Sequence, residues 1–470
     1  MNHSSLPLAA ALACSVAHCI PSEGGFRDLD RMVADRLGPD VHAPRAHAND
    51  SGDLDPTLRA RLAHPLDAEA AMRIALANNR DLRASLASLG VAAGVLLQAS
   101  LLPNPTGGLS YRFPLSPGAQ SVGAVWDADA VIDVRALLLL PAGRQAASAE
   151  FEATRYGVAA RTVDVAYAAR VALYRYQAAA QQVEMLRTAL EATTAGLAVA
   201  RALTEAGNLP SLDLAQQQVL YEDTRIQLAT AENEQHQAHE RVNVALGLWG
   251  GDVQWQAEPR LADVPSTESG IDHVESDAVD RSLVLEAGLR RIEASRARLG
   301  LARAAGWLPQ LEAGVAVARE EGHDFAGPSV RIGVPLFNQG QGMATVRTAE
   351  LQRDEAQYVA TAVRLRSVVR VAREQLMFSR AQVEWYRTVQ LPLRERIVEQ
   401  SQLQYNAMQL GVFQLIQARR EEIRAGRGYI DALRTYWVAR ANLSRLLAGG
   451  SPDEAMGSDA SSVQPIEGSL

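Results

Sequence analysis

The stretch that decides the fold is Pro141-Ala142-Gly143-Arg144-Gln145-Ala146-Ala147, which opens a long Ala-rich helical pattern. A counterpart, Asn338-Gln339-Gly340-Gln341-Gly342-Met343-Ala344, lies about 200 positions later and opens a second such pattern. Each copy follows a strand-like run. A tandem duplication of this kind, with long helices and few strands, restricts the fold sharply.

The duplication extends outward from these stretches over residues 66–251 and 278–450. Upstream, Leu101-Leu102-Pro103-Asn104-Pro105 has its counterpart in Trp307-Leu308-Pro309-Gln310-Leu311. Downstream, Leu248-Trp249-Gly250-Gly251 has its counterpart in Leu446-Leu447-Ala448-Gly449-Gly450. Each repeat is therefore predicted to contain a helix, two strands, a long helix and a return helix, in this order.

The strands are predicted from alternation of apolar and polar residues near 106–114, 128–140, 310–319 and 328–337. Ile132, Val134, Ala136 and Leu138, for example, alternate with Asp133 and Arg135. The first helix of repeat 1, from Leu66 to about Leu102, shows helical spacing instead, and Asp67 is its expected N-cap.

Each repeat is expected to form a helical hairpin. The long helices run from Gly143 to about Ala206 and from Gly342 to about Met408. Tight turns follow at Glu205-Ala206-Gly207-Asn208-Leu209-Pro210 and at Met408-Gln409-Leu410-Gly411-Val412, and return helices span about 211–249 and 412–448. We expect a β-branched residue at Gly411 to strain the second turn.

The segments outside the repeats have a different composition. Residues 1–16 are predicted to be a signal peptide, with Cys14 as a possible lipidation site; an ordinary cleaved signal peptide is the alternative. Residues 17–65 are predicted to be a poorly structured arm. Residues 252–277 are predicted to form a polar linker packed near the middle of the repeats, and residues 451–470 a disordered tail.

Composition excludes several classes of function. The formal net charge is −8, and arginine is interspersed with acidic residues, so no nucleic-acid partner is expected. We find no nucleophile-and-base pair, phosphate-binding loop or cysteine pair, so neither an enzyme nor a cofactor is predicted. No segment after the leader has 18 uninterrupted apolar residues, which argues against a membrane-spanning helix.

The predicted strands are suited to a membrane. Four strands cannot close into a barrel, because closed membrane barrels need about eight, and open edges in lipid are prohibitively costly. Two copies would give eight strands and three copies twelve. The expected interface aromatics are Tyr111, Phe113, Trp126, Trp307 and Phe337. The alternative is a soluble β-hairpin packed on the helices.

These features resemble the TolC-like outer membrane efflux proteins, within them the CzcC-like and CusC-like heavy-metal branch. The most specific matches are Tyr405-Asn406-Ala407-Met408-Gln409-Leu410-Gly411-Val412-Phe413-Gln414-Leu415 and Val334-Pro335-Leu336-Phe337-Asn338-Gln339-Gly340, together with Gly207 and Leu212-Asp213-Leu214-Ala215-Gln216. The resemblance covers nearly all of residues 66–450.

The resemblance implies a mainly α fold with a membrane β-barrel contribution: a homotrimeric α-barrel and a shared 12-stranded barrel in outer-membrane lipid. It implies a passive duct from the periplasm through the outer membrane of a Gram-negative cell. Its partners would be a periplasmic adaptor (membrane fusion) protein and an inner-membrane transporter of the resistance-nodulation-division type. Its cargo would be heavy-metal cations or drugs. The alternative is a secreted or surface-anchored coiled-coil scaffold without channel activity.

The resemblance also places a gate at the hairpin tips, around Gly207, Asp213, Gly411, Gln414 and Gln417. Asp213 matches an acidic tip position of the family, whereas the same count from Met408 reaches Gln414 and then Gln417. Paired carboxylates are thus missing from repeat 2, which puts a cation-selective ring in doubt. Asp213 has an alternative role as a helix N-terminal charge. Arg419, Arg420, Glu421 and Glu422 belong either to a solvated face or to the gate.

A metal site is the last possibility. His236 and His239 stand three apart on a predicted helix, with Glu232 and Glu240 near them, and such a set can bind a divalent ion. Helical His and Glu at this density also occur by chance. We therefore predict no resident metal and assign cargo specificity to the pump.

Overall fold

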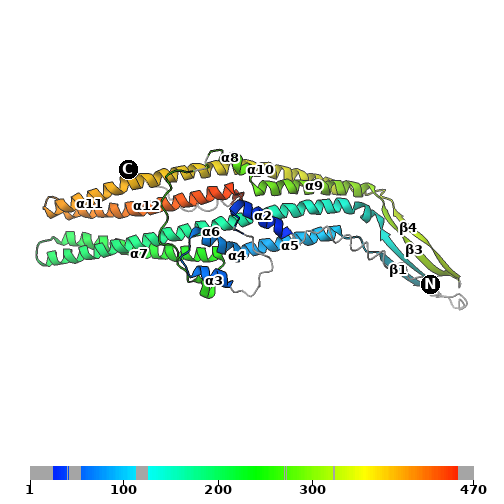
Figure 1. Ribbon diagram of the computed structural model, residues 1–470, viewed down its shortest axis with the longest axis horizontal. Coiled ribbons are helices and arrows are strands. Elements are labelled where there is room, and N and C mark those ends of the chain that lie inside the picture. The colour runs from blue at the N-terminus through cyan, green and yellow to red at the C-terminus, as the bar shows by residue number, and fades with distance from the viewer. Residues whose placement is uncertain are drawn as a thin grey trace. The chain divides into compact units, whose positions relative to one another are not determined.

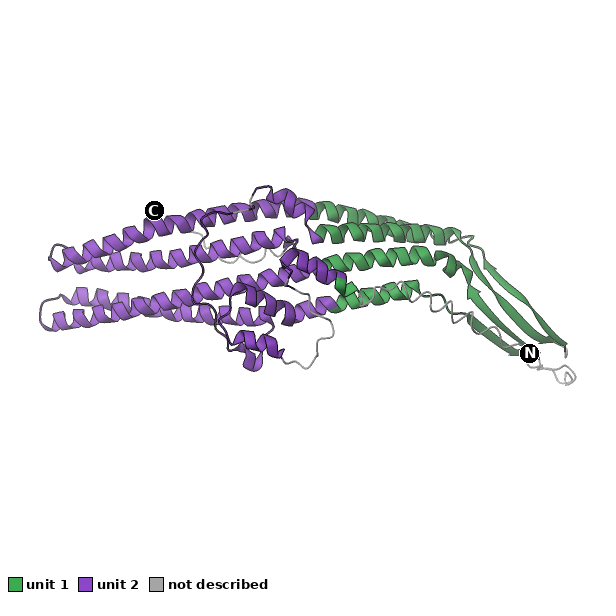
Figure 2. Cartoon of the chain, viewed as in Figure 1, with its two compact units in different colours: residues 1–27, 87–158, 284–361 green, residues 28–86, 159–283, 362–470 purple. Residues whose placement is uncertain are grey.

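The computed structural model describes residues 25–39, 41, 54–112, 125–268, 270, 272–320 and 323–453 (Figure 1). The chain divides into two compact units (Figure 2). Unit 1 comprises residues 1–27, 87–158 and 284–361, and unit 2 comprises residues 28–86, 159–283 and 362–470. Each unit draws on both repeats.

Unit 1 contains the four predicted strands, joined in one antiparallel sheet in the order β1-β2-β3-β4 (Figure 1). Their bounds are β1 Thr106–Arg112, β2 Val125–Asp133, β3 Gln310–Glu320 and β4 His323–Gly333. Central pairing of β2 with β3 joins the two repeats in one sheet. Phe113 and Pro114, at the predicted end of the first strand, lie outside the described residues.

The predicted second strand is too long. β2 ends at Asp133, and α6, Val134–Glu205, begins at once and contains Pro141. Asp133 explains the early start, because its Oδ1 accepts a hydrogen bond from the Ala136 N–H at 2.8 Å, as an N-capping residue does. The apolar alternation from 134 to 138 therefore lies in the first turns of a helix.

The predicted fourth strand is shifted. β4 begins at His323 and ends at Gly333, so residues 323–327, which precede the predicted strand, are also paired with β3. Pro328 pairs with Val315. In the sheet of the single chain β4 is an edge strand, which is where proline occurs in sheets.

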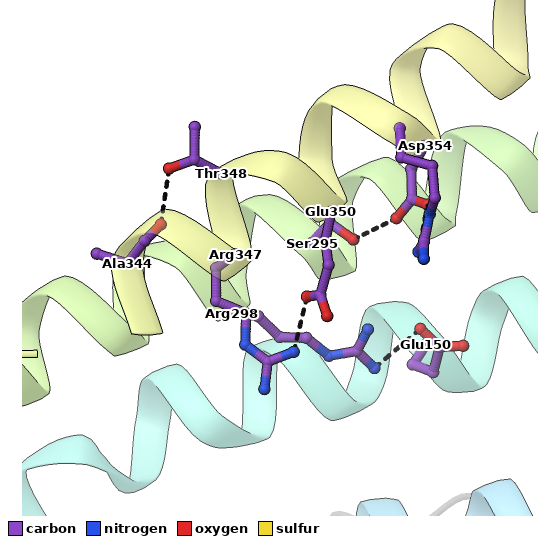
Figure 3. A network of polar contacts seen from close by, with 9 residues as sticks. Glu150, Ser295, Arg298, Ala344, Arg347, Thr348, Glu350 and Asp354 are labelled. Atoms are coloured by element: carbon purple, nitrogen blue, oxygen red, sulfur yellow. Dashed lines mark hydrogen bonds and ion pairs between the residues drawn. The ribbon is translucent and has the colours of Figure 1, made fainter. Parts of the chain in front are cut away.

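Helices of unit 1 are tied together by polar contacts, one between the repeats and one within repeat 2 (Figure 3). Parts of α5 (Arg80–Ser100), α6, α9 (Leu283–Trp307) and α10 (Gln341–Trp385) lie in this unit. Arg298 of α9 donates to Glu150 of α6 at 3.0 Å. Buried Ser295 of α9 donates to Asp354 of α10 at 2.6 Å.

Asp354 has a pKa that reflects this environment. Burial alone would raise the pKa of its carboxyl group, but the hydrogen bond from Ser295 and the guanidinium of Arg353 outweigh burial, so the pKa lies below its usual value. The two helices are therefore joined by a carboxylate that stays ionised.

Unit 2 contains the two helical hairpins (Figure 1). The first pairs α6 with α7, Ser211–Leu246. The second pairs α12, Val412–Leu447, with α10, a π-helical segment η4 (Tyr386–Gln390) and α11 (Leu391–Asn406). The π-helical segment precedes Pro392, whose missing N–H cannot take part in a regular helix ladder. Predicted hairpins and return helices are confirmed.

The first predicted helix of repeat 1 is divided into α4 (Ala68–Asn78) and α5, with Asp67 capping α4 as expected. The break occurs at Asn79, where the backbone is extended and the side chain accepts from the Leu82 N–H at 2.9 Å. Asn78 donates to the Gly247 carbonyl at 2.8 Å. The break therefore docks the end of α7.

The prediction that residues 17–65 form a poorly structured arm is wrong in part. It contains α2 (Phe26–Leu37) and α3 (Pro56–Leu62), although residues 42–53 between them lie outside the described range. Leu29 and Val33 give α2 a buried apolar stripe. Asp55 accepts a hydrogen bond from the Thr57 N–H at 2.8 Å and caps α3. Both signals were present in the sequence.

The predicted linker also has structure. A 3-10 helix, η3 (Gly250–Val253), starts it and α8 (Val274–Asp280) ends it. Between them Ala257 forms a parallel bridge with Leu66, and Trp255 is buried.

Helix α5 is long and apolar enough to cross a membrane, by length and composition only. This differs from the expectation drawn from uninterrupted apolar runs, since a few polar residues interrupt it. One such helix is weak support for a span, because core helices pass the same test.

Candidate functional site: a two-faced sheet and two hairpin tips

The sheet of unit 1 separates apolar from polar residues across all four strands. Directly paired residues of neighbouring strands point to the same face, so the register defines each face. One face carries Leu109, Tyr111, Trp126, Ala128, Ala130, Ile132, Leu311, Ala313, Val315, Val317, Ala326, Val330 and Ile332. We call it the apolar face. The ion pair of Arg319 with Asp324 stands at its end near the β3–β4 turn.

The apolar face is exposed in the single chain. Leu109 is 78% exposed, Val315 62% and Ile332 60%. Large side chains of this kind on three different strands form a continuous patch, which soluble monomers rarely leave open to water. The face therefore fits lipid better than water.

The other face, here the polar face, is rich in charge. Its polar residues are Thr106, Ser110, Arg112, Asp127, Asp129, Asp133, Gln310, Glu312, Glu320, His323, Ser329 and Arg331. Val125, Val131 and Phe325 also lie on it, among glycine and alanine. Arg112 pairs with Asp127 at 2.9 Å, and Arg331 pairs with Glu312. Acidic groups outnumber basic ones on this face, which gives it a negative potential.

Gly108 has a definite role on the polar face. A Cβ at this position would lie 2.5 Å from the Asp129 Oδ1, so a larger residue would displace the carboxylate. The small residue holds Asp129 against the β1 backbone.

The edges of the sheet are β1 and β4. Edge strands present unpaired N–H and C=O groups, which in lipid cost several kcal/mol each. A sheet that faces lipid on one side therefore needs further strands at both edges.

The predicted interface aromatics are only partly on the sheet. Tyr111 and Trp126 are cross-strand partners on the apolar face. Trp307 ends α9 and is 82% exposed, and Phe337 lies beyond β4 and is 92% exposed. Phe113 lies outside the described residues. Phe325, which we did not predict, stands in β4 on the polar face.

The hairpin tips of unit 2 share one backbone conformation. Gly207 has φ 75°, and its N–H donates to the Thr204 carbonyl at 2.9 Å. The Asn208 N–H donates to the Leu203 carbonyl at 2.8 Å. This pair of bonds is the Schellman motif, which satisfies the last carbonyls of a helix.

The second tip corrects the expectation for Gly411. Its backbone is extended, with φ −75° and ψ 157°, and it precedes the first turn of α12. Met408 takes the left-handed position instead, with φ 57°, and its N–H donates to the Tyr405 carbonyl at 3.0 Å. The nearest atom to a Cβ on Gly411 is the mobile end of Gln414. A β-branched residue at Gly411 is therefore tolerated.

The other predicted tip residues lie on the return helices. Asp213 is the third residue of α7, and Gln414 is the third residue of α12, so both occupy one position in the two repeats. Gln417 follows one turn later, half-buried. Asp213 lies where a helix N-terminus favours negative charge, and Gln414 replaces that charge with an amide.

Contacts between the two hairpins begin close to these tips. Leu220 of α7 packs with Val412 and Ile416 of α12. Arg420 of α12 donates to Asp223 of α7 at 2.9 Å. Farther along, Gln182 of α6 donates to Asp431 of α12 at 2.8 Å.

The sequence could not single out these partners. Asp223 and Asp431 stand 197 and 249 residues from theirs, so neither pair has a local pattern. Within the predicted charged group, Arg420 pairs across the hairpins, whereas Arg419 pairs with Glu422 on its own helix at 3.0 Å.

Two of the four residues considered for metal binding, His239 and Glu232, make other contacts. His239 stacks on Trp255 with ring centroids 4.5 Å apart, and its Nδ1 lies 3.3 Å from the Asn243 amide nitrogen. Glu232 pairs with Arg187 at 2.9 Å. Among the described residues no three His, Cys, Asp or Glu gather as a metal site. Cys14 lies outside that range.

Known proteins share this architecture. No family model matches the sequence. The chain is 21% identical over 422 residues to the cobalt-zinc-cadmium resistance protein CzcC of Cupriavidus metallidurans, a match that covers 86% of this chain and 94% of CzcC. The structure of CusC aligns with a TM-score of 0.69 at 18% identity, over 88% of this chain and 100% of CusC. The CmeC outer membrane channel of Campylobacter jejuni aligns with a TM-score of 0.69 at 15% identity, over 82% of this chain and 86% of CmeC.

The chain has the fold of an outer membrane channel. The predicted resemblance to TolC-like outer membrane efflux proteins is confirmed at the level of the fold, and CzcC, a cobalt-zinc-cadmium resistance protein, represents the heavy-metal branch that the sequence indicated. Within this outer membrane channel fold, the sheet of unit 1 and the hairpin tips of unit 2 are the candidate functional sites.

Proposed function

We propose that this chain is the outer-membrane channel of a tripartite efflux system, a passive duct through which solutes leave the periplasm of a Gram-negative cell. The observation that carries the proposal is the two-faced sheet, whose apolar face is exposed and whose edges are open. A secreted scaffold would have no use for an exposed apolar face.

The proposal requires several copies of the chain. Four strands per chain give twelve in a homotrimer, enough to close a barrel and to pair β1 of one copy with β4 of the next. The apolar face then contacts outer-membrane lipid and the polar face lines water. The hairpins of three copies form the α-barrel in the periplasm.

The partners belong to the same proposal. A duct without its own energy source needs a pump, so we assign a periplasmic adaptor and an inner-membrane transporter of the resistance-nodulation-division type. Heavy-metal cations are the favoured cargo, because CzcC is a cobalt-zinc-cadmium resistance protein and the polar face has an excess of carboxylates.

The hairpin tips form the gate in this proposal. Gly207, Asp213, Gln414 and Gln417 belong to it, and Gly411 closes the second turn without a special conformation. Opening separates the hairpins and breaks the Arg420–Asp223 pair. Both side chains are partly exposed, so the pair contributes only about 0.5 kcal/mol and the gate opens at low cost.

The remaining segments are assigned by the sequence. The signal within residues 1–16 directs export, cleavage occurs immediately before Cys14, and Cys14 carries the lipid. Replacement of Cys14 by Ser should abolish incorporation of radioactive palmitate; persistent labelling would place the lipid elsewhere.

The proposal is tested by mass and conductance together. The full chain, purified from membranes, should give the mass of three copies by native mass spectrometry and discrete conductance steps in planar lipid bilayers. A single copy without conductance would overturn the proposal. A trimer without steps would support the assembly and indicate that the gate is closed in the isolated protein.

A further inference from the structure

A cavity of about 770 Å³ lies between the two hairpins of unit 2. Its two long walls are residues 181–196 of α6 and residues 415–430 of α12. Fifteen steps at 1.5 Å per residue make such a wall about 22 Å long. The cavity is therefore a slot, elongated along the helices.

Two apolar clusters of the hairpins border the slot. On one side Val183, Leu186 and Ala231 pack together, and on the other side Leu220 and Ile416 pack with Val412. Packed protein interiors leave few voids larger than a water molecule. A space of this volume lies instead in the range of small-molecule sites, about 300–1,000 Å³.

The walls of the slot are mainly apolar and carry no net charge. The apolar lining includes Met185, Leu220, Leu391, Leu415, Ile416 and Ile423. The charged lining is neutralised in pairs, Glu184 with Arg260 at 2.9 Å and Arg419 with Glu422 at 3.0 Å. An ion would gain nothing here that compensates its loss of hydration.

Gln217 supplies a polar group that is available to a ligand in the slot. Gln217 of α7 is half-buried, and its side-chain amide makes no hydrogen bond to any described residue. Its Oε1 would lie 3.7 Å from a Cβ on Gly196. The amide offers an NH2 donor group and a carbonyl acceptor to a molecule beside Gly196.

We propose that this slot binds an elongated, uncharged and mainly apolar small molecule with one hydrogen-bonding group, such as a long-chain alcohol. The molecule lies along α6 and α12 and its polar group contacts Gln217. The inference rests on the geometry of unit 2 and does not require the chain to conduct.

Photolabelling tests the proposal directly. The full chain, assembled in lipid nanodiscs, is irradiated with a dodecanol that carries a diazirine on its chain, and the modified peptides are identified by mass spectrometry. We expect labels in residues 181–196 and 415–430, and excess unlabelled dodecanol should remove them. Absence of labels there would overturn the proposal, because it would show that the slot is filled by a neighbouring copy or closed in lipid.

A blocking variant and a matched control sharpen the result. Gly196→Leu places a side chain in the slot, and leucine favours a helix more than glycine does, so the variant should fold. Labelling of the slot should fall about ten-fold, because the ligand and the leucine would overlap. Gly157→Leu makes the same change on α6 outside the slot, where no atom lies within 4 Å of the new Cβ, and should label like the parent.

The same experiment separates this proposal from the proposed function. A membrane-embedded sheet also collects the probe, on residues such as Val315 and Ile332 of the apolar face. Slot labels without sheet labels would support the binding site and contradict the membrane sheet. Sheet labels without slot labels would do the reverse. Equal slot labelling of Gly196→Leu and the parent would also overturn the binding site.

Discussion

The two hairpin turns have the same backbone and different residues. Gly207 and Met408 both take left-handed conformations, and the same two hydrogen bonds close each helix. At the third residue of the following helices, however, the first repeat has the charged Asp213 and the second repeat has the uncharged Gln414. Duplication has preserved the geometry of the turn while the side chains diverged.

At the C-terminal ends of the return helices α7 and α12, by contrast, the two repeats have kept the same residue. Gly247 and Gly449 are both glycine, both have positive φ, and both are crowded by backbone. A Cβ on Gly247 would lie 2.6 Å from the Asn78 carbonyl oxygen, and one on Gly449 would lie 2.7 Å from the Arg281 carbonyl oxygen. Methionine is found where the turn requires only a positive φ. Glycine is found where the turn also leaves no room for a Cβ atom.

The largest predicted effect tests this distinction. Gly449→Ala should destabilise unit 2 by about 3 kcal/mol, because the left-handed conformation and the backbone overlap both oppose the methyl group. Gly207→Ala has the same unfavourable φ in open space and should cost only about 1 kcal/mol. The midpoint of thermal unfolding, followed by circular dichroism, gives the comparison. Equal shifts would contradict the role of space.

The next effect exchanges the residues of the two tips. Met408→Gly should stabilise the second turn by about 1 kcal/mol, because glycine adopts positive φ without strain. Gly207→Met should destabilise the first turn by a similar amount. Gly411→Val, three residues away, serves as the control and should change the unfolding midpoint little. If Gly411→Val lowered the unfolding midpoint more than Gly207→Met does, Gly411 would be the residue on which the second turn depends.

A smaller effect concerns the contact between the hairpins. Asp223→Ala removes the pair with Arg420 and should lower stability by about 0.5 kcal/mol, as for other partly exposed pairs. Conductance in planar bilayers should nevertheless rise, since fewer contacts hold the hairpins together. Arg187→Ala breaks a pair within the first hairpin, with Glu232, and should leave conductance unchanged. Equal conductance of the two variants would show that the Arg420–Asp223 pair plays no part in gating.

The smallest effect is a pH dependence confined to one repeat. Before the strands the two repeats align with an offset of 206, as between Trp307 and Leu101, so the counterpart of Ser295 is Leu89. After the strands they align with an offset of 197, as between Asn338 and Pro141, so the counterpart of Asp354 is Gly157. Repeat 1 therefore lacks this polar contact. Because the folded-state pKa of Asp354 is lowered, its contribution to stability is complete above 3.8 and is lost as the pH falls through the folded value.

Ser295→Ala tests this pH dependence. It should lower the unfolding midpoint at pH 7 and make a smaller difference at pH 3, where Asp354 becomes protonated in the unfolded chain. Chemical-shift titration of the Asp354 carboxyl should show its pKa rising in the variant. A constant difference at both pH values would mean that Ser295 acts through packing alone.

Much of the fold could be predicted because its signals are local. Pro103, Pro105 and Pro309 end helices, and the turns after Ala206 and Met408 are short and polar. The errors arose where one pattern fits two structures. Alternation at 132–138 fits a strand, yet the cap at Asp133 starts a helix. The contacts between hairpins could not be predicted, because Arg420 and Asp223 meet only after both hairpins have folded.

The central claim is that one face of the sheet contacts lipid and the other contacts water. Val315 and Ala316 are neighbours in β3 on opposite faces, so each is replaced by cysteine in the full chain and treated with a membrane-impermeant maleimide after reconstitution. The unsubstituted chain provides the blank for Cys14 and Cys19. We predict that Ala316→Cys is labelled through the aqueous lumen and that Val315→Cys is protected until detergent dissolves the bilayer. Equal labelling of both positions in intact membranes would contradict the account.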